Sequence, residues 1–244
     1  MGGFVAWMQG TRPDGCDSLA VQVAPREHWP DLHALVVVVS DDKKGTSSTA
    51  GMQRTVETSE LLQHRIKNVV PVRMAAISDA IKAKDFDVFA QITMQDSNQF
   101  HAVALDTNPP IFYMNDVSRS IVGLIVEYNR VSVMAGGKLR AAYTFDAGPN
   151  AVIYALQENI PEIVNLLVAY FPHSVAFKDP FGLFGFASQP GELPLPDGFN
   201  PLVAKKFDFD AVKNIIHTRV GDGPQVLGDN DALLGADGFP KVAA

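Results

Sequence analysis

The sequence predicts an α+β fold in which a small sheet packs against amphipathic helices. Two observations favour this fold class. Apolar and β-branched runs at residues 34–39, 139–145 and 151–156 are typical of strands. Between and after them, apolar residues recur at helical spacing. The order strand, helices, paired strands and helix therefore indicates an α+β sandwich.

Composition narrows the class of protein. The 244 residues are 47% hydrophobic, enough to bury a substantial core in one large or two small domains. A net charge of −7 without a Lys/Arg cluster argues against nucleic-acid partners. Cys16 is the only cysteine, which fits a reducing compartment. No apolar run approaches the roughly 20 residues of a membrane span, and no secretory signal pattern opens the sequence, so we expect a cytoplasmic protein without a membrane partner.

The first apolar run, residues 2–7, predicts a short strand that enters a loop rich in Gly and Pro. We expect its partner strands to lie outside the printed sequence, which would leave an unpaired edge. The alternative is a free-standing hairpin arm, a kind of unit that is marginally stable. Residues 34–39 then predict a buried strand.

A hydroxyl-rich stretch, residues 46–49, follows Lys43 and Lys44 and precedes a predicted helix that runs through Leu62. Hydroxyls at a helix start cap free N–H groups, and the same helix end attracts phosphate. The stretch is therefore either an N-cap alone or a phosphate contact. The two lysines add charge to such a site or belong to a solvated loop.

Two further helices are predicted before residue 106. Pro71 suits a helix start, and a stripe of apolar residues follows it: Val72, Ala75, Ala76, Ala80 and Ile81. Residues 86–105 predict the second helix, which carries four polar side chains within about one and a half turns: Asp96, Ser97, Asn98 and His101. They form a polar patch facing a cleft or meet only water. No partner at ligand spacing accompanies His101, which favours a structural histidine over a metal ligand.

The remaining elements follow from periodicity and from Gly and Pro. A long helix with a buried stripe ends before Gly136 and Gly137: Val117, Ile121, Leu124, Ile125 and Tyr128. This Gly pair is a chain break and lacks the pattern of a phosphate cradle. Residues 161–170 predict a helix that buries Ile163, Leu166, Leu167 and Tyr170. An irregular region, a strand at 212–220 and a fraying Gly-rich tail complete the chain.

Asp146 lies between two predicted strands, where residues 147–150 read as a chain reversal. A carboxylate at a strand end can be held rigidly while its oxygens face a cleft, where it can accept a proton. The alternative is that Asp146 caps its own turn, since Asp side chains bond nearby backbone N–H groups.

A family resemblance adds to this interpretation. Residues 143–151, Tyr-Thr-Phe-Asp-Ala-Gly-Pro-Asn-Ala, resemble the segment that carries the catalytic aspartate of diphosphomevalonate decarboxylases, within the superfamily of galactokinase, homoserine kinase, mevalonate kinase and phosphomevalonate kinase. Other segments resemble the same family in the same order: residues 2–7, 43–52, 96–101, 105–111 and 221–225. The likeness is dense up to about residue 171 and thins after it.

The resemblance implies a domain organisation. Residues 1–33 would be a remnant of an N-terminal ATP-binding domain, and residues 34–171 a C-terminal α/β sandwich of ferredoxin-like type that carries the catalytic Asp. Residues 172–244 would be an irregular extension with one returning strand. The family's ATP-phosphate loop, its early Lys and Tyr contacts and its substrate-binding Arg precede the Gly-Gly-Phe segment, where this chain has only Met1. The chain therefore resembles the rear part of the enzyme.

The resemblance also implies a function: ATP-dependent decarboxylation of mevalonate 5-diphosphate to isopentenyl diphosphate, in sterol and isoprenoid synthesis. Asp146 would be catalytic, Ser48 and Thr49 would contact the substrate diphosphate, and Met52 would line its pocket. ATP and Mg²⁺ are the implied cofactors, with binding groups largely outside this chain, and a homodimer is the implied assembly. We expect the truncated chain to be inactive alone. The alternatives are a non-catalytic binding or dimerisation module and a related small-molecule kinase.

Overall fold

The computed structural model describes residues 1–39, 48–184, 191, 194–235 and 237–241. Its centre is a four-stranded antiparallel sheet with the strand order β4-β5-β3-β6. The strands are β3 (Leu32–Val38), β4 (Ala141–Phe145), β5 (Ala151–Leu156) and β6 (Asn214–Arg219). Within the described residues β4 pairs with β5 alone, so it forms one edge of the sheet, and Asp146 directly follows its last residue.

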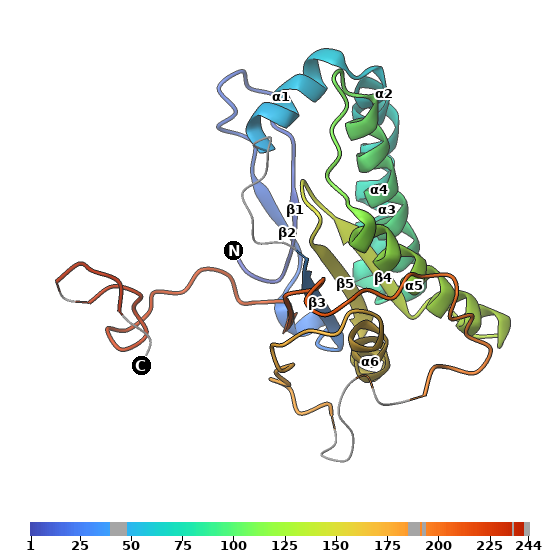
Figure 1. Cartoon of the computed structure of the whole chain (residues 1–244). Helices are drawn as coiled ribbons and strands as arrows, with labels where there is room; N and C mark the ends of the chain where they lie inside the picture. The colour runs from blue at the N-terminus through green and yellow to red at the C-terminus, as the bar shows by residue number, and fades with distance from the viewer. Residues whose placement is uncertain (40–47, 185–190, 192–193, 236, 242–244) are drawn as a thin grey trace.

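The described part of the chain has six α-helices, of which α1 and α2 lie at the upper end of the molecule in Figure 1: α1 (Ser48–Thr58), α2 (Glu60–His64), α3 (Val70–Ala83), α4 (Phe86–Asp106), α5 (Asp116–Met134) and α6 (Ile160–Tyr170). A π-helical turn (Arg65–Val69) joins α2 to α3, and two 3-10 turns occur at Arg26–His28 and Gln157–Asn159. Helices α3 and α4 pack along each other, and Figure 1 shows α6 in the lower part of the molecule. The predicted α+β class is confirmed.

The main core lies between one face of the sheet and helices α5 and α6. Leu35 and Ile153 on the strands pack with Ile121 and Leu166 on the helices, and all four are fully buried. The buried stripes predicted on α5 and α6 are confirmed, because every residue assigned to them is buried. The 3.6-residue periodicity of these apolar residues therefore correctly predicted which face of each helix is buried.

A second core joins the N-terminal residues to α3 and α4. Strand β1 (Phe4–Trp7) pairs antiparallel with β2 (Ala20–Ala24) in a separate two-stranded sheet. Phe4, Trp29 and Phe89 bury their rings together beside Ala142 of β4. The expectation of a strand without a partner in this sequence was therefore wrong, since β2 supplies the partner, as in the hairpin alternative.

The stripe predicted on α3 was partly wrong. Val72 and Ala75 are exposed, whereas Ala80 and Ile81 pack into the second core as predicted, together with Ile77, which was not predicted. Burial on α3 is set by where α4 lies against it, so only the C-terminal part of the predicted stripe is covered. The helix expected through Leu62 also breaks at Ser59, whose hydroxyl caps α2 by accepting the N–H of Leu62 at 3.1 Å.

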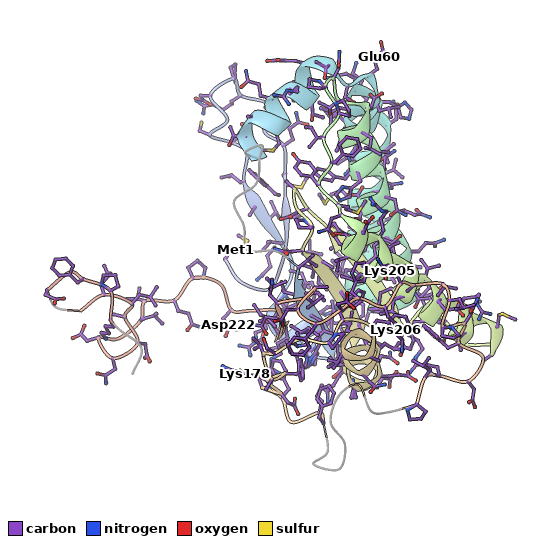
Figure 2. All side chains as sticks on the ribbon, viewed as in Figure 1. Met1, Glu60, Lys178, Lys205, Lys206 and Asp222 are labelled. Carbon is purple, nitrogen blue, oxygen red and sulfur yellow. The ribbon has the colours of Figure 1, made fainter. Side chains whose placement is uncertain are left out.

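The chain after α6 is irregular as predicted: between residues 172 and 213 the described residues form no helix or strand. β6 then returns to pair with β3. Beyond it, the Gly3 N–H donates to the carbonyl of Gly221 at 2.9 Å, and Arg26 forms an ion pair with Asp222. Figure 2 shows Met1 and Asp222 on the same side of the molecule. The helices in the described ranges include none long and apolar enough to span a bilayer.

Candidate active site

Asp146 leaves the end of β4 with an exposed side chain. The chain reversal after it is closed by the backbone, because the Gly148 N–H donates to the carbonyl of Asp146 at 2.8 Å. From the residues that the structure describes, the Asp146 carboxylate receives no hydrogen bond. The carboxylate therefore does not act as a cap of its own turn here, and its oxygens remain available to a ligand.

The turn after Asp146 is tied to two other elements. The Ser118 hydroxyl, at the start of α5, donates to the carbonyl of Pro149 at 2.8 Å. The Asn150 side-chain oxygen accepts the N–H of Val39, just after β3, at 2.8 Å. Because Ser118 is itself fixed in a capping box with Asn115, the turn is anchored to a well-formed helix start.

Helix α4 holds the other side of the strand end. The Ser97 hydroxyl accepts the N–H of Phe145 at 3.0 Å, and the hydroxyl of Tyr143 donates to the side-chain oxygen of Asn98 at 3.0 Å. Ser97 and His101 are both buried. Much of the predicted polar patch on α4 therefore bonds to β4, and the alternative in which its members meet only water was wrong for these residues.

His101 lies next to the candidate catalytic carboxylate. Burial lowers the pKa of His101, while a hydrogen bond to the backbone of Phe145 and the negative charge of Asp146 act in the opposite direction. The net lowering leaves the imidazole neutral at neutral pH. Among the described residues, no three His, Cys, Asp or Glu side chains come together as metal ligands.

Tyr113 links Asp146 to helix α1, and sequence reasoning missed it. Burial and then the charge of Asp146 raise the pKa of the Tyr113 hydroxyl. A Cβ atom on Gly51 of α1 would lie 2.5 Å from that hydroxyl, so only glycine permits this approach. The hydroxyl of Tyr113 therefore lies against α1 and within electrostatic reach of Asp146.

Helix α1 carries the predicted substrate-binding residues. Ser48 is its first residue, and Thr49 in its first turn is exposed. Met52 is 58% exposed and lines a cavity of about 330 Å³ together with Phe100 and Tyr113. Residues 43–47 of the predicted phosphate-contacting stretch, Lys43 and Lys44 included, lie outside the described residues. Met52 and Asp146 thus share one neighbour, Tyr113, which lines the cavity with Met52 and interacts electrostatically with Asp146.

The far end of α1 is fastened to α4. The hydroxyls of Thr55 and Thr107 lie 2.9 Å apart, and the Ser59 hydroxyl donates to the carboxylate of Asp106 at 2.7 Å. The same helix α4 therefore contacts both the element that carries Met52 and the strand that ends at Asp146.

A second cavity, of about 290 Å³, opens between α3, α4 and the sheet. Arg65 reaches into it and donates two hydrogen bonds to Asp96, at 2.7 and 2.8 Å, and Arg73 donates a third at 3.0 Å. Burial acts to raise the pKa of Asp96, but the two guanidinium groups outweigh it and the pKa is lowered. Asp96 thus belongs to this ion-pair network rather than to the group around Asp146.

The residues described here do not form a nucleotide cradle at the Gly pair. The Gly136 and Gly137 N–H groups donate to the carbonyls of Val133 and Ser132, at 3.0 and 2.9 Å, so they close the C-terminal end of α5. The interpretation of this pair as a chain break is confirmed.

Comparison with known proteins places this geometry in a family. The family model described as "Mevalonate 5-diphosphate decarboxylase C-terminal domain" matches residues 34–227. The chain belongs to this family. A diphosphomevalonate decarboxylase of Ganoderma lucidum is 71% identical over 240 residues, which are 98% of this chain and 60% of the relative. The chain therefore spans about 60% of the length of that relative, as it does of the human one, at 48% identity.

Solved structures agree with the family assignment. The mevalonate diphosphate decarboxylase of Trypanosoma brucei, 34% identical, superposes with a TM-score of 0.82 over 95% of this chain and 60% of its own. Another relative, solved in complex with MVAPP, AMPPCP and magnesium, is 29% identical with a TM-score of 0.57 and covers 68% of this chain and 48% of its own. The expected C-terminal domain fold of the superfamily is confirmed.

Proposed function

We propose that this chain supplies the catalytic aspartate and part of the substrate site for ATP-dependent decarboxylation of mevalonate 5-diphosphate. Asp146 accepts the proton of the substrate's tertiary hydroxyl while the oxygen of that hydroxyl attacks the γ-phosphoryl group of ATP, and ADP leaves. The bond between the tertiary carbon and the phosphorylated oxygen then breaks, and phosphate leaves with that electron pair. The bond between the substrate and its carboxylate carbon breaks at the same time and releases carbon dioxide. The electron pair of this carbon–carbon bond forms the double bond of isopentenyl diphosphate. The observation that carries this proposal is an exposed carboxylate at a strand end whose backbone is bonded on several sides.

Helix α1 supports the proposed diphosphate contact. The N-terminal end of an α-helix presents free N–H donors and a partial positive charge, both of which favour a phosphate group. Thr49 lies exposed in this first turn. We assign Ser48 and Thr49 to the diphosphate and Met52 to the wall of the substrate pocket, which fits its place on the cavity shared with Tyr113.

ATP and Mg²⁺ are proposed as the cofactors because a solved relative holds AMPPCP and magnesium. In the described part of this chain, no three His, Cys, Asp or Glu side chains gather into a metal site. The N–H groups of Gly136 and Gly137 close a helix and do not face a ligand site. The proposal therefore gives none of the described residues a role in binding nucleotide. We propose that a front segment, like the part of the relatives that this chain does not cover, supplies those groups.

Several broader assignments are part of the same proposal. The reaction would serve sterol and isoprenoid synthesis in the cytoplasm, where the exposed free thiol of Cys16 fits a reducing environment. We propose residues 1–33 as the remnant of a nucleotide-binding domain, residues 34–171 as the domain carrying Asp146 and residues 172–244 as an extension. A homodimer is proposed as the assembly, supported by exposed apolar side chains on the β1–β2 hairpin such as Trp7.

The proposal is tested by comparing the chain alone with the chain joined to the front segment of the 71% identical relative. We expect the completed chain to release carbon dioxide from mevalonate 5-diphosphate only when Mg-ATP is present. The chain alone should show neither micromolar binding of Mg-ATP by calorimetry, which would correspond to about −8 kcal/mol, nor release of carbon dioxide. An inactive completed chain that folds would instead favour a non-catalytic module.

A further inference from the structure

The outer edge of β4 is covered by side chains in place of a neighbouring strand. In an antiparallel edge strand, alternate residues turn both their N–H and their C=O away from the paired strand. At the first residue of β4, both groups are bonded by Asn129 of α5: its amide donates to the Ala141 carbonyl at 2.8 Å and its oxygen accepts the Ala141 N–H at 3.1 Å. Asn129 is buried.

The last residue of β4 has the same orientation, since Phe145 lies four residues after Ala141 along the strand. Its N–H is taken by the Ser97 hydroxyl at 3.0 Å. The backbone of Phe145 also acts to raise the pKa of His101, which is the effect of an acceptor beside the imidazole, and because the N–H is already used, the carbonyl is the group that can accept. Ser97 and His101 stand at positions i and i+4 of α4, which places them on one face of the helix.

The imidazole of His101 is oriented by its surroundings. Its ring packs edge-on against Phe145, with centroids 6.2 Å apart, and against Phe100 and Tyr113 at 5.2 and 6.3 Å. The Nε2 atom is buried and has no partner among the described residues, which leaves Nδ1 as the nitrogen that can donate to the Phe145 carbonyl. A neutral imidazole protonated on Nδ1 satisfies this arrangement, because it leaves no N–H group buried without an acceptor.

We propose that Ser97 and His101 form a two-residue clamp on the peptide groups of Phe145 that sets the position and direction of Asp146. The two residues are positioning residues, since neither is assigned a contact with substrate. Because the clamp bonds the backbone directly before Asp146, a change in it displaces the carboxylate without altering its chemistry. This inference rests on the proposed catalytic role of Asp146 for its functional consequence, but the clamp itself is tested without catalysis.

The clamp makes a spectroscopic prediction for the 244-residue chain. Long-range nitrogen–proton correlation spectra should show His101 as the neutral Nδ1–H tautomer. The Asp146→Asn variant should lower the pKa of His101, because the negative charge that favours the imidazolium is lost. An Nε2–H tautomer at His101 would overturn the assigned bond to the carbonyl.

Amide exchange provides a matched comparison of the two ends of β4. Ser97→Ala and His101→Phe should speed exchange at Phe145 and Asp146 by roughly tenfold or more, because local openings there lose a closing bond. The control variant Asn129→Ala should act at the other end, on Ala141, and leave Phe145 and Asp146 unchanged. Uniform changes along β4 in all three variants would overturn the clamp, as would no change at Phe145. His101→Asn restores a donor near the position of Nδ1 and keeps the test available if the Phe variant does not fold.

In the chain completed with a front segment, Ser97→Ala and His101→Phe should lower kcat by roughly tenfold to a hundredfold, the range expected from small misplacement of a reacting group, while KM changes by about twofold or less. His101→Asn should recover part of the loss, and Asn129→Ala should leave kcat per folded molecule within about twofold. Equal losses in the Asn129→Ala control would contradict a positioning role. If the completed chain is inactive while the exchange pattern is as expected, the proposed function fails and the clamp stands.

Discussion

The strand end at Asp146 and the β1–β2 hairpin are both β-structure, yet they are held in different ways. At the end of β4, residues of α4 and α5 bond to the backbone on either side of Asp146, and the Asn150 side chain in the following turn accepts the N–H of Val39. The hairpin is a separate two-stranded unit in which Phe4 is buried while Val5 and Trp7 are 48% and 76% exposed. The backbone around Asp146 is held by several elements, whereas the hairpin packs against the rest of the molecule on one side only.

The difference shows which part of the site this chain builds by itself. An isolated two-stranded unit is only marginally stable in water, and apolar side chains that stay exposed contribute no hydrophobic stabilisation. A strand end bonded from several elements holds its carboxylate in one place before any ligand arrives, which is a requirement for efficient proton transfer. The chain thus prepares the position of Asp146, whereas the exposed side of the hairpin is left uncovered by the described residues.

The largest expected contrast between the two regions is in amide exchange. We expect rapid exchange in residues 2–20 and slow exchange in residues 34–39 and 139–145, with rates differing by at least roughly a hundredfold, since core strands open only near the global free energy of unfolding. Hydrogen–deuterium exchange on a dilute, monomeric sample measures this. Uniform protection would show that the hairpin is held as firmly as the central sheet.

Truncation of a core residue sharpens the same contrast in stability. Ile121 is fully buried between α5 and the sheet, so Ile121→Ala should lower the free energy of unfolding by about 2–5 kcal/mol. Trp7→Ala on the exposed side of the hairpin should change it by only about 0.5 kcal/mol or less. Urea unfolding of both variants tests the pair, and similar losses would contradict the one-sided packing of the hairpin.

The free energy of unfolding should also depend on pH through a buried pair of histidines. His33 Nδ1 and His217 Nε2 lie 2.8 Å apart between β3 and β6, under the ring of Phe181. Burial and the nearby His33 lower the pKa of His217 to about 4, although Asp179 opposes the shift. The unfolded chain takes up this proton near pH 6.5 and the folded chain only near pH 4. The contribution of His217 to the free energy of unfolding is therefore complete above pH 6.5. It is lost as the pH falls towards 4, by up to about 3 kcal/mol.

Urea unfolding between pH 7 and 4.5 measures this dependence. His217→Gln removes the titrating group and should flatten the slope between pH 6.5 and 4.5. An unchanged slope in the variant would assign the pH dependence to other groups.

Local pattern predicted much of the fold because some elements are buried on one regular face. The bounds of β5 and the buried stripe of α5 follow directly from such patterns. The pairing of β1 with a neighbouring strand was given only as the alternative, because residues 20–24 lie across a loop and carry a weak strand signal. The remaining pairings and buried faces depend on how the elements pack in three dimensions, which local sequence pattern does not contain.

The candidate site shows the same limit. Asp146 was found from its turn and from the family motif, but the partners that fix it were not. Ser97 and His101 were predicted only as members of a polar patch on a helix, with His101 as a structural histidine, and their role depends on α4 lying along the edge of β4. A hydroxyl and an imidazole spaced i, i+4 were the available signal. Tyr113 gave none, because its relation to Gly51 exists only in the folded chain.

The central claim is that Asp146 is the proton acceptor of the decarboxylation. It is tested most directly by Asp146→Asn in the chain completed with a front segment, since the amide keeps the size of the side chain but cannot take the proton. Steady-state release of carbon dioxide should fall by about a hundredfold or more, while the dissociation constant for mevalonate 5-diphosphate stays within about twofold. Turnover unchanged by the substitution would contradict the catalytic role of Asp146.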